Sequence, residues 1–133
     1  MIAHVFVDAE NISPAVTFKV VEHFGKEHTI TKVDIIGKEE VISHRYRDLD
    51  KNLYRVQNCF YGKNSADTWL CIEIVRAIID EPELELIIIV SCDKDFLPVI
   101  KFAADFEKKI FVVSDGTGHR RLIELLKTLE VHP

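Results

Sequence analysis

The sequence predicts an α/β fold in which helices cover both faces of a five-stranded parallel sheet. Short apolar runs rich in β-branched residues alternate with helical patterns along the chain, as in proteins with buried parallel strands. Two of these runs, Ile2–Val7 and Leu86–Val90, lead directly into aspartates, where open α/β sheets bind their ligands. With 133 residues and 47% hydrophobic content, we expect a single domain over residues 1–133.

The first strand is expected over Ile2–Val7, followed by a helix. Ser13 can cap this helix, and Pro14 is a favoured first helical residue. Gly25 predicts that the helix ends near residue 24.

The next segment predicts a strand, a helix and a short strand. Thr31–Ile36 forms an apolar run that Gly37 ends, and Tyr54–Phe60 is expected to be the third strand. Between them, apolar and long side chains recur at spacings of three and four residues, which predicts an amphipathic helix. The positions are Val41, Ile42, Arg45, Tyr46, Leu49 and Leu53.

A third helix is expected over residues 66–79, capped by Asn64 or Ser65. Its predicted buried face consists of Leu70, Ile74, Ala77 and Ile78. After the fourth strand, Leu86–Val90, Asp95 can cap a helix that tolerates Pro98 in its first turn. A fifth strand is expected over Ile110–Val113. A last helix would bury Leu122, Leu125, Leu126 and Leu129.

Composition excludes several classes of protein. Cys59, Cys71 and Cys92 show no CxxC spacing, which indicates reduced, mostly buried thiols rather than disulfides or a zinc site. No apolar stretch could span a bilayer, and residues 1–20 lack the features of a signal peptide. We therefore expect a soluble cytoplasmic protein without a membrane partner. The net charge of -5 does not by itself indicate nucleic-acid binding.

Acidic residues gather where the central strands are expected to end. Asp8 closes the first strand, and Asp93 and Asp95 follow the fourth, which is its expected neighbour in a right-handed doubly wound sheet. Asp67 lies in the first turn of the third helix, which can point into the same crevice. Clustered carboxylates repel, so either some stay protonated or a hard cation binds. Oxygen-only ligands favour Mg²⁺ or Mn²⁺ over zinc, and such a site suits phosphoryl chemistry.

Each aspartate also has a purely structural interpretation. Asp95 can be a helix cap, Asp67 can form a capping pair with Asn64, and Asp8 can hold a turn through its own backbone. Caps do not require acids at the ends of both central strands, however, so together the aspartates favour a metal site.

Three further acids lie near these positions. Glu73 is six residues beyond Asp67, about 120° away on a helix, so a site role and a solvated face explain it equally well. Glu10 is expected to be exposed. Asp115 closes the fifth strand and could be a peripheral acid of the site.

Three motifs resemble those of NYN domains, a PIN-like, LabA-type family. They are Asp8-Ala9-Glu10-Asn11, Lys63-Asn64-Ser65-Ala66-Asp67 and Ser91-Cys92-Asp93-Lys94-Asp95-Phe96. The resemblance extends from residue 2 to about residue 115 and implies a three-layer PIN-like fold with strand order 3-2-1-4-5. It also implies an Mg²⁺ or Mn²⁺ site used for RNA cleavage. The metal ligands would be Asp8, Asp67, Asp93 and Asp95.

The resemblance also suggests supporting roles and shows two departures. Asn11 and Ser91 would orient ligands or waters. Cys92 stands where the family usually has glycine, and Lys94 where it often has a small polar residue. Neither departure removes a carboxylate.

Contacts with a substrate are less sharply defined. Lys63 can reach a phosphate near the metal, or it is an exposed loop lysine. Arg120 and Arg121 follow a glycine-containing loop at a predicted helix start, where an anion can bind. Trp69 and Tyr61 can stack on bases. The alternative for Trp69, one turn into an amphipathic helix, is a place in the core or at an interface. Four basic residues around the second helix are expected to lie on a solvated face: Arg45, Arg47, Lys51 and Arg55.

These features favour a metal-dependent ribonuclease that cuts single-stranded or structured RNA endonucleolytically. The alternative is an RNA-binding or protein-interaction module of the same fold, either monomeric or a homodimer. A phosphatase of the haloacid-dehalogenase type is a poor match, because the Asp8-x-Glu10 loop lacks the second aspartate of a DxD motif.

Overall fold

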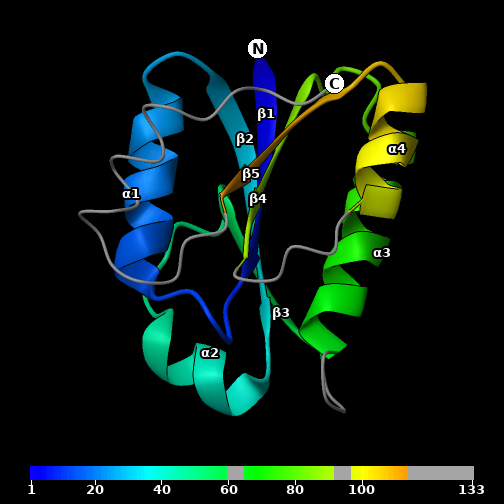
Figure 1. Cartoon of the computed structure of the whole chain (residues 1–133). Coiled ribbons are helices and arrows are strands. Elements are labelled where there is room, and N and C mark those ends of the chain that lie inside the picture. The colour runs from blue at the N-terminus through cyan, green and yellow to red at the C-terminus, as the bar shows by residue number, and fades with distance from the viewer. Residues whose placement is uncertain (60–64, 92–96, 114–133) are drawn as a thin grey trace.

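A computed structural model describes residues 1–59, 65–91 and 97–113 of the chain. Strands and helices alternate from β1 to β5 in this part (Figure 1). The elements are β1 (Ile2–Asp8), α1 (Pro14–Gly25), β2 (Thr29–Gly37), α2 (Glu39–Arg45), β3 (Tyr54–Asn58), α3 (Ser65–Asp80), β4 (Leu86–Val90), α4 (Leu97–Asp105) and β5 (Lys109–Val113).

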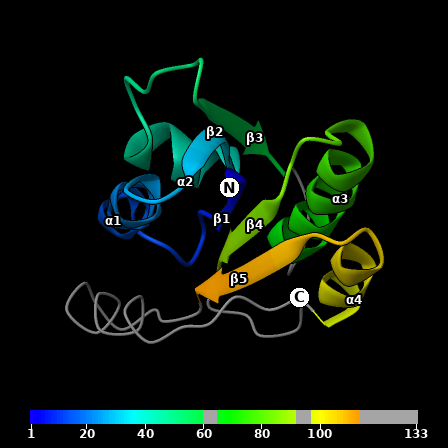
Figure 2. The same cartoon turned by 90° about the horizontal axis from the view of Figure 1, so that it is seen from above.

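The five strands form one parallel sheet in the order β3-β2-β1-β4-β5. Helices α1 and α2 cover one face, and α3 and α4 cover the other (Figures 1 and 2). β1 lies at the centre, where Val5 pairs with Val33 of β2 and with Ile88 of β4. The predicted α/β class and the strand order implied by the family resemblance are therefore confirmed.

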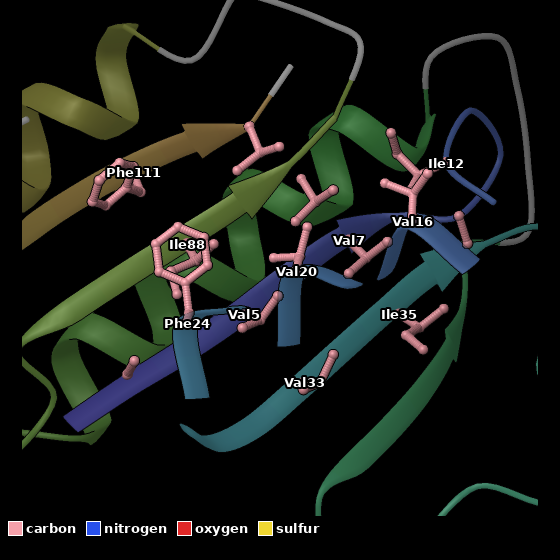
Figure 3. Packing of buried hydrophobic residues seen from close by; sticks show 14 of the residues in the cluster. Val5, Val7, Ile12, Val16, Val20, Phe24, Val33, Ile35, Ile88 and Phe111 are labelled. Carbon is pink, nitrogen blue, oxygen red and sulfur yellow. The ribbon is translucent and has the colours of Figure 1, made fainter. Parts of the chain in front are cut away.

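Each face of the sheet has its own hydrophobic core. On the α1 side, Val16, Val20 and Phe24 pack on the strands, and the Phe24 ring contacts that of Phe111 with centroids 5.0 Å apart (Figure 3). On the α3 side, the four helix residues predicted to be inward are all buried: Leu70, Ile74, Ala77 and Ile78. β4 is buried at every position, which is why a continuous apolar run identified it.

Helix α1 begins as its sequence predicts. The Ser13 hydroxyl accepts a hydrogen bond from the Val16 amide at 3.4 Å, and Pro14 is the first helical residue. Both features satisfy or remove amide groups that would otherwise lack partners in the first turn.

The predicted second helix is too long. α2 ends at Arg45, and Asp48 has a φ of 54°, a left-handed conformation that cannot continue a right-handed helix. The following turn is closed by the amides of Leu53 and Tyr54, which both donate to the Asp50 carbonyl oxygen. Leu49 and Leu53 still pack against the core. The four-residue spacing of Leu49 and Leu53 therefore results from a turn that packs both side chains against the core, and not from a helix.

The remaining differences concern the ends of elements. β3 ends at Asn58, short of the predicted Phe60, and α4 has Pro98 near its start as expected. Cys59 is buried and Cys71 is half-buried, whereas Cys92 and the expected last helix lie outside the described residues. Within the described ranges, no helix has the length and hydropathy required to cross a bilayer.

Candidate active site at the carboxyl edge of the sheet

Asp8 occupies the central position of the sheet edge. It is the last residue of β1, and its side chain is fully buried. β2 and β3 lie on one side of β1 in the sheet, and β4 and β5 lie on the other. The order of the strands reverses at this point, and open α/β sheets bind ligands at such switch points.

Three donors hold the Asp8 carboxylate. Its Oδ2 accepts hydrogen bonds from Asn11 Nδ2 at 2.8 Å and from the Ser91 hydroxyl at 3.3 Å. Its Oδ1 accepts from the Glu10 amide at 3.2 Å. A carboxylate offers about four acceptor positions, and the three donors from the described residues fix its orientation.

Ser91 connects the ends of two strands to this carboxylate. It follows β4 directly and is fully buried, and its amide donates to the Val113 carbonyl of β5 at 2.9 Å. The Ser91 hydroxyl then reaches across to Asp8 at the end of β1. The predicted adjacency of the first and fourth strands is confirmed, and it brings Ser91 to Asp8. The expected convergence of the Asp8, Asp93 and Asp95 carboxylates stays a prediction, because Asp93 and Asp95 lie outside the described residues.

The loop that carries Asn11 is folded tightly against β2. The Ala9 amide donates to the Ile36 carbonyl at 2.8 Å, and the Ile12 amide donates to the Asp8 carbonyl at 3.0 Å. Ala9 and Ile12 are both buried. Because both sides of the loop are anchored, Asn11 is held where its amide group reaches Asp8.

Glu10 lies at the same edge, and the prediction that it is exposed is wrong. Its side chain is 22% exposed, and its carboxylate lies 3.8 Å from the Lys38 ammonium group. Lys38 directly precedes α2, so this ion pair connects the loop after β1 to the start of the second helix.

Most of the other predicted site residues lie outside the described part of the chain. Asp67 lies in the first turn of α3 as expected, and α3 begins on the side of the sheet where β1 ends (Figure 1). Outside the described residues lie Tyr61, Lys63, Asp93, Asp95, Asp115, Arg120 and Arg121. Among the side chains that are described, no three His, Cys, Asp or Glu residues form a group that could hold a metal ion.

A buried polar network beneath α3 was not predicted. His4 Nε2 lies 2.7 Å from Asp34 Oδ2, and Gln57 Nε2 donates to Asp34 Oδ1 at 3.1 Å. Trp69 Nε1 in turn donates to Gln57 Oε1 at 3.2 Å. This hydrogen bond holds the Trp69 indole against the sheet, which favours its structural role over base stacking. The available signal was the occurrence of His4 and Asp34 inside otherwise apolar strands.

Glu73 belongs to the same side of the sheet. Its side chain is 3% exposed and accepts a hydrogen bond from Arg76 at 3.1 Å, while Arg55 of β3 lies 3.9 Å away. The solvated-face interpretation of Glu73 is therefore wrong, and its described partners are arginines rather than Asp8.

The four basic residues predicted around the second helix do not share a helical face. Arg45 is the last residue of α2, and Arg47 follows it and donates to the Ser43 carbonyl at 3.0 Å. Lys51 belongs to the turn before β3, and Arg55 lies on β3 itself.

Comparison with known families agrees with this architecture. The sequence model of the NYN domain family matches residues 3–127. No curated protein matches the chain. The family match includes all five strands and the positions of all four predicted metal-binding aspartates. The sheet order is that of a PIN-like fold. The chain belongs to the NYN domain family.

Proposed function

We propose that the chain is a metal-dependent ribonuclease that hydrolyses RNA phosphodiesters endonucleolytically. The observation that carries the proposal is the buried Asp8 carboxylate, held at the switch point of the sheet by donors from two loops. Membership of the NYN family, which belongs to a PIN-like nuclease superfamily, supports this chemistry and RNA as the substrate.

The donor atoms at this edge suit a hard divalent cation. Asp8, Asn11 and Ser91 carry carboxylate, amide carbonyl and hydroxyl oxygens at this edge, and oxygen ligands favour Mg²⁺ or Mn²⁺. We assign the ligand role to Asp8, Asp67, Asp93 and Asp95. When bound, the cation would activate water and neutralise charge developing on the phosphate.

The residues of this chain would position the reacting groups. Ser91 and Asn11 hold Asp8 in one orientation, which reduces the reorganisation needed during reaction. They are positioning residues, because both act through the Asp8 carboxylate. Lys63, Arg120 and Arg121 are assigned to RNA phosphates, where basic side chains fix the register of a nucleic acid.

A cleavage assay tests this proposal. Labelled RNA is incubated with Mg²⁺ or Mn²⁺, with and without chelator, using the native protein and the Asp8→Asn variant. We expect cleavage to require metal and to fall by orders of magnitude in Asp8→Asn, whereas RNA binding should weaken far less. Asp105→Asn is the matched control, because Asp105 is an exposed acid at the end of α4.

The Asp8→Asn variant needs a folding control. In the native protein the donors face the carboxylate oxygens of Asp8. In the variant one of these oxygens is replaced by an NH₂ group, which is itself a donor. We therefore expect the free energy of unfolding to fall by about 1 to 3 kcal/mol. Assays below the unfolding temperature of the variant separate this loss from lost chemistry. A folded Asp8→Asn protein that cuts RNA at the native rate would contradict the proposal.

One observation favours a second candidate, an RNA-binding or protein-interaction module. The Glu10 amide donates to Asp8 two residues earlier, an arrangement by which aspartates commonly stabilise turns. In that case RNA binding would be indifferent to divalent metal and to loss of the four aspartates. Sedimentation analysis would show whether such a module forms a homodimer.

A further inference from the structure

A groove lies beside the edge strand β3, away from Asp8. We call it the β3 groove; it is bounded by the turn of residues 46–53, by β3 and by Lys32 of β2. Its volume is about 470 Å³, within the range of pockets that hold small organic groups. Tyr54, in its wall, pairs with Val33, whereas Asp8 pairs with Ile36 three residues further along β2. The two places are therefore about 10 Å apart along the strands and about 10 Å across them.

The wall of the β3 groove is apolar and includes an oriented aromatic ring. Leu49, Leu53, Tyr54 and Val56 line it, and Val56 is 41% exposed. An edge-on contact with Phe18 holds the Tyr54 ring. The two ring centroids are 5.9 Å apart, and the angle between the ring planes is 86°. Fixed aromatic surfaces of this kind can stack on nucleobases without demanding a sequence.

The rim of the β3 groove is basic although the chain carries a net charge of -5. Lys32, Lys51 and Arg55 line it, against one acid, Asp48. Within the described part of the chain, neither lysine makes an ion pair. Arg55 is partly neutralised, because its guanidinium lies 3.8 Å from Asp34 and 3.9 Å from Glu73.

The other acid of the turn, Asp50, lies outside the lining of the groove. It accepts a hydrogen bond from the Asn52 amide at 2.9 Å. Lys32 also borders a smaller cavity lined by Asp34, Glu73, Asp80 and Glu81, so its charge is partly offset. Ammonium groups beside an aromatic and aliphatic wall are complementary to a ligand that combines phosphate charge with a flat ring. A nucleotide within an RNA strand has both properties.

We propose that the β3 groove is a second RNA contact site, remote from the cleavage edge. A base would pack against Tyr54 and Val56, with the adjoining phosphates on Lys32 and Lys51. The inference rests on the proposed function in taking RNA as the substrate. The β3 groove would contribute to the affinity for RNA, because none of its residues lies at the Asp8 edge.

Equilibrium binding of fluorescein-labelled single-stranded RNA in chelator tests the proposal without cleavage. The variants are Lys32→Ala with Lys51→Ala, Tyr54→Leu and Tyr54→Phe. The control is Lys26→Ala with Lys101→Ala, which removes two exposed lysines elsewhere. We expect the first pair to weaken binding and to reduce the slope of log K against log salt by about 1.4, or 0.7 for each phosphate contact.

The tyrosine variants test stacking separately. Tyr54→Leu should raise Kd about tenfold, whereas Tyr54→Phe should bind like the native protein, because it keeps the ring. Thermal unfolding verifies that each variant is folded. If Tyr54→Leu does not fold, the double variant of Lys32 and Lys51 still tests the proposal. Equal effects in the Lys26 and Lys101 control, or native affinity in the groove lysine pair, would overturn the proposal.

Metal-dependent cleavage measured on the same variants separates the two proposals. We expect the groove lysine pair to raise KM with kcat unchanged. The lysine pair could lose RNA binding while the native protein shows no metal-dependent cleavage. That result would support the groove as an RNA contact site and contradict the proposed ribonuclease activity. Metal-dependent cleavage with an unaltered KM would support the ribonuclease and overturn the groove.

Discussion

Two polar residues, His4 and Asp8, are buried within the otherwise apolar strand β1, and each has a hydrogen-bond partner among the described residues. His4, Phe6 and Asp8 alternate with the apolar residues that face α1, and the His4 ring stacks on Phe6 with centroids 4.1 Å apart. His4 bonds to Asp34, and Asp8 accepts from Asn11 and Ser91. Buried polar groups without partners cost free energy, and these contacts offset most of that cost in a central strand. Among the described residues, His4 Nδ1 makes no hydrogen bond, and it lies 3.4 Å from Glu81 Oε2.

Breaking the His4–Asp34 pair should destabilise the fold. Both side chains are about 2% exposed, and His4→Leu would leave a buried carboxylate without this partner, at a cost of about 3 kcal/mol. Adding Asp34→Asn should recover part of the loss, because an uncharged amide is cheaper to bury. Urea unfolding of the two single variants and the double variant measures the coupling. Strictly additive losses would show that the pair does not interact energetically.

Tyr46 should make stability depend on pH in the alkaline range. Burial is the main cause that raises its pKa from 10.0 to about 12, and its hydroxyl bonds with Thr17 at 2.8 Å. The unfolded chain loses this proton first as pH rises, so the contribution is complete below pH 10 and is lost between about 10 and 12.

Tyr46→Phe removes that titrating group while keeping the ring. We expect its free energy of unfolding to be lower at pH 8 because the Thr17 hydrogen bond is lost, but to fall less steeply above pH 10. Chemical denaturation at a series of pH values gives both slopes. Identical slopes would assign the alkaline loss to other groups.

At the scale of elements, buried strands were predictable and the region after α2 was not. β4 could be located because every side chain is buried, so hydrophobicity alone marks it. The segment after Arg45 shows helical spacing, yet Asp48 adopts a left-handed conformation and Asp50 closes a turn. Local spacing cannot distinguish a helix from a turn that packs the same residues against a core.

Gly37 links the end of β2 to the loop that carries Asn11. A Cβ there would lie 3.0 Å from Ile42 Cγ2 and 3.2 Å from Ala9 Cβ, and Ala9 is anchored on β2 beside Asp8. Gly37→Ala should therefore destabilise the protein by about 1 to 3 kcal/mol and reduce RNA cleavage through the displaced loop. Thermal unfolding and the cleavage assay measure the two effects.

Gly25→Ala is the matched control for this substitution. A Cβ at Gly25 would meet only Ile30 Cδ1, at 3.9 Å, which is an ordinary van der Waals contact. We expect unchanged or slightly raised stability, because alanine restricts the unfolded chain. Equal losses in both variants would show that the close approach at Gly37 is not responsible.

For the whole molecule, strand order determined how much of the site could be predicted. Apolar runs that end in acids bring Asp8 and Ser91 together once β1 and β4 are neighbours. The network around Asp34 could not be predicted, because it depends on strand register and on the rotation of α3 about its axis. That rotation also directs the Glu73 side chain toward Arg55. The angle between Asp67 and Glu73 around the helix axis was not enough to predict this contact.

A metal titration of the intact chain tests the central claim most directly. If four carboxylates share a cation at the Asp8 edge, Mn²⁺ should raise the melting temperature, and 100-fold excess over Kd corresponds to about 2.7 kcal/mol. Asp93→Asn should remove this increase and leave the metal-free protein as stable as the native one or more so, because repulsion is relieved. The same Mn²⁺-dependent increase in the Asp93→Asn variant would contradict the account.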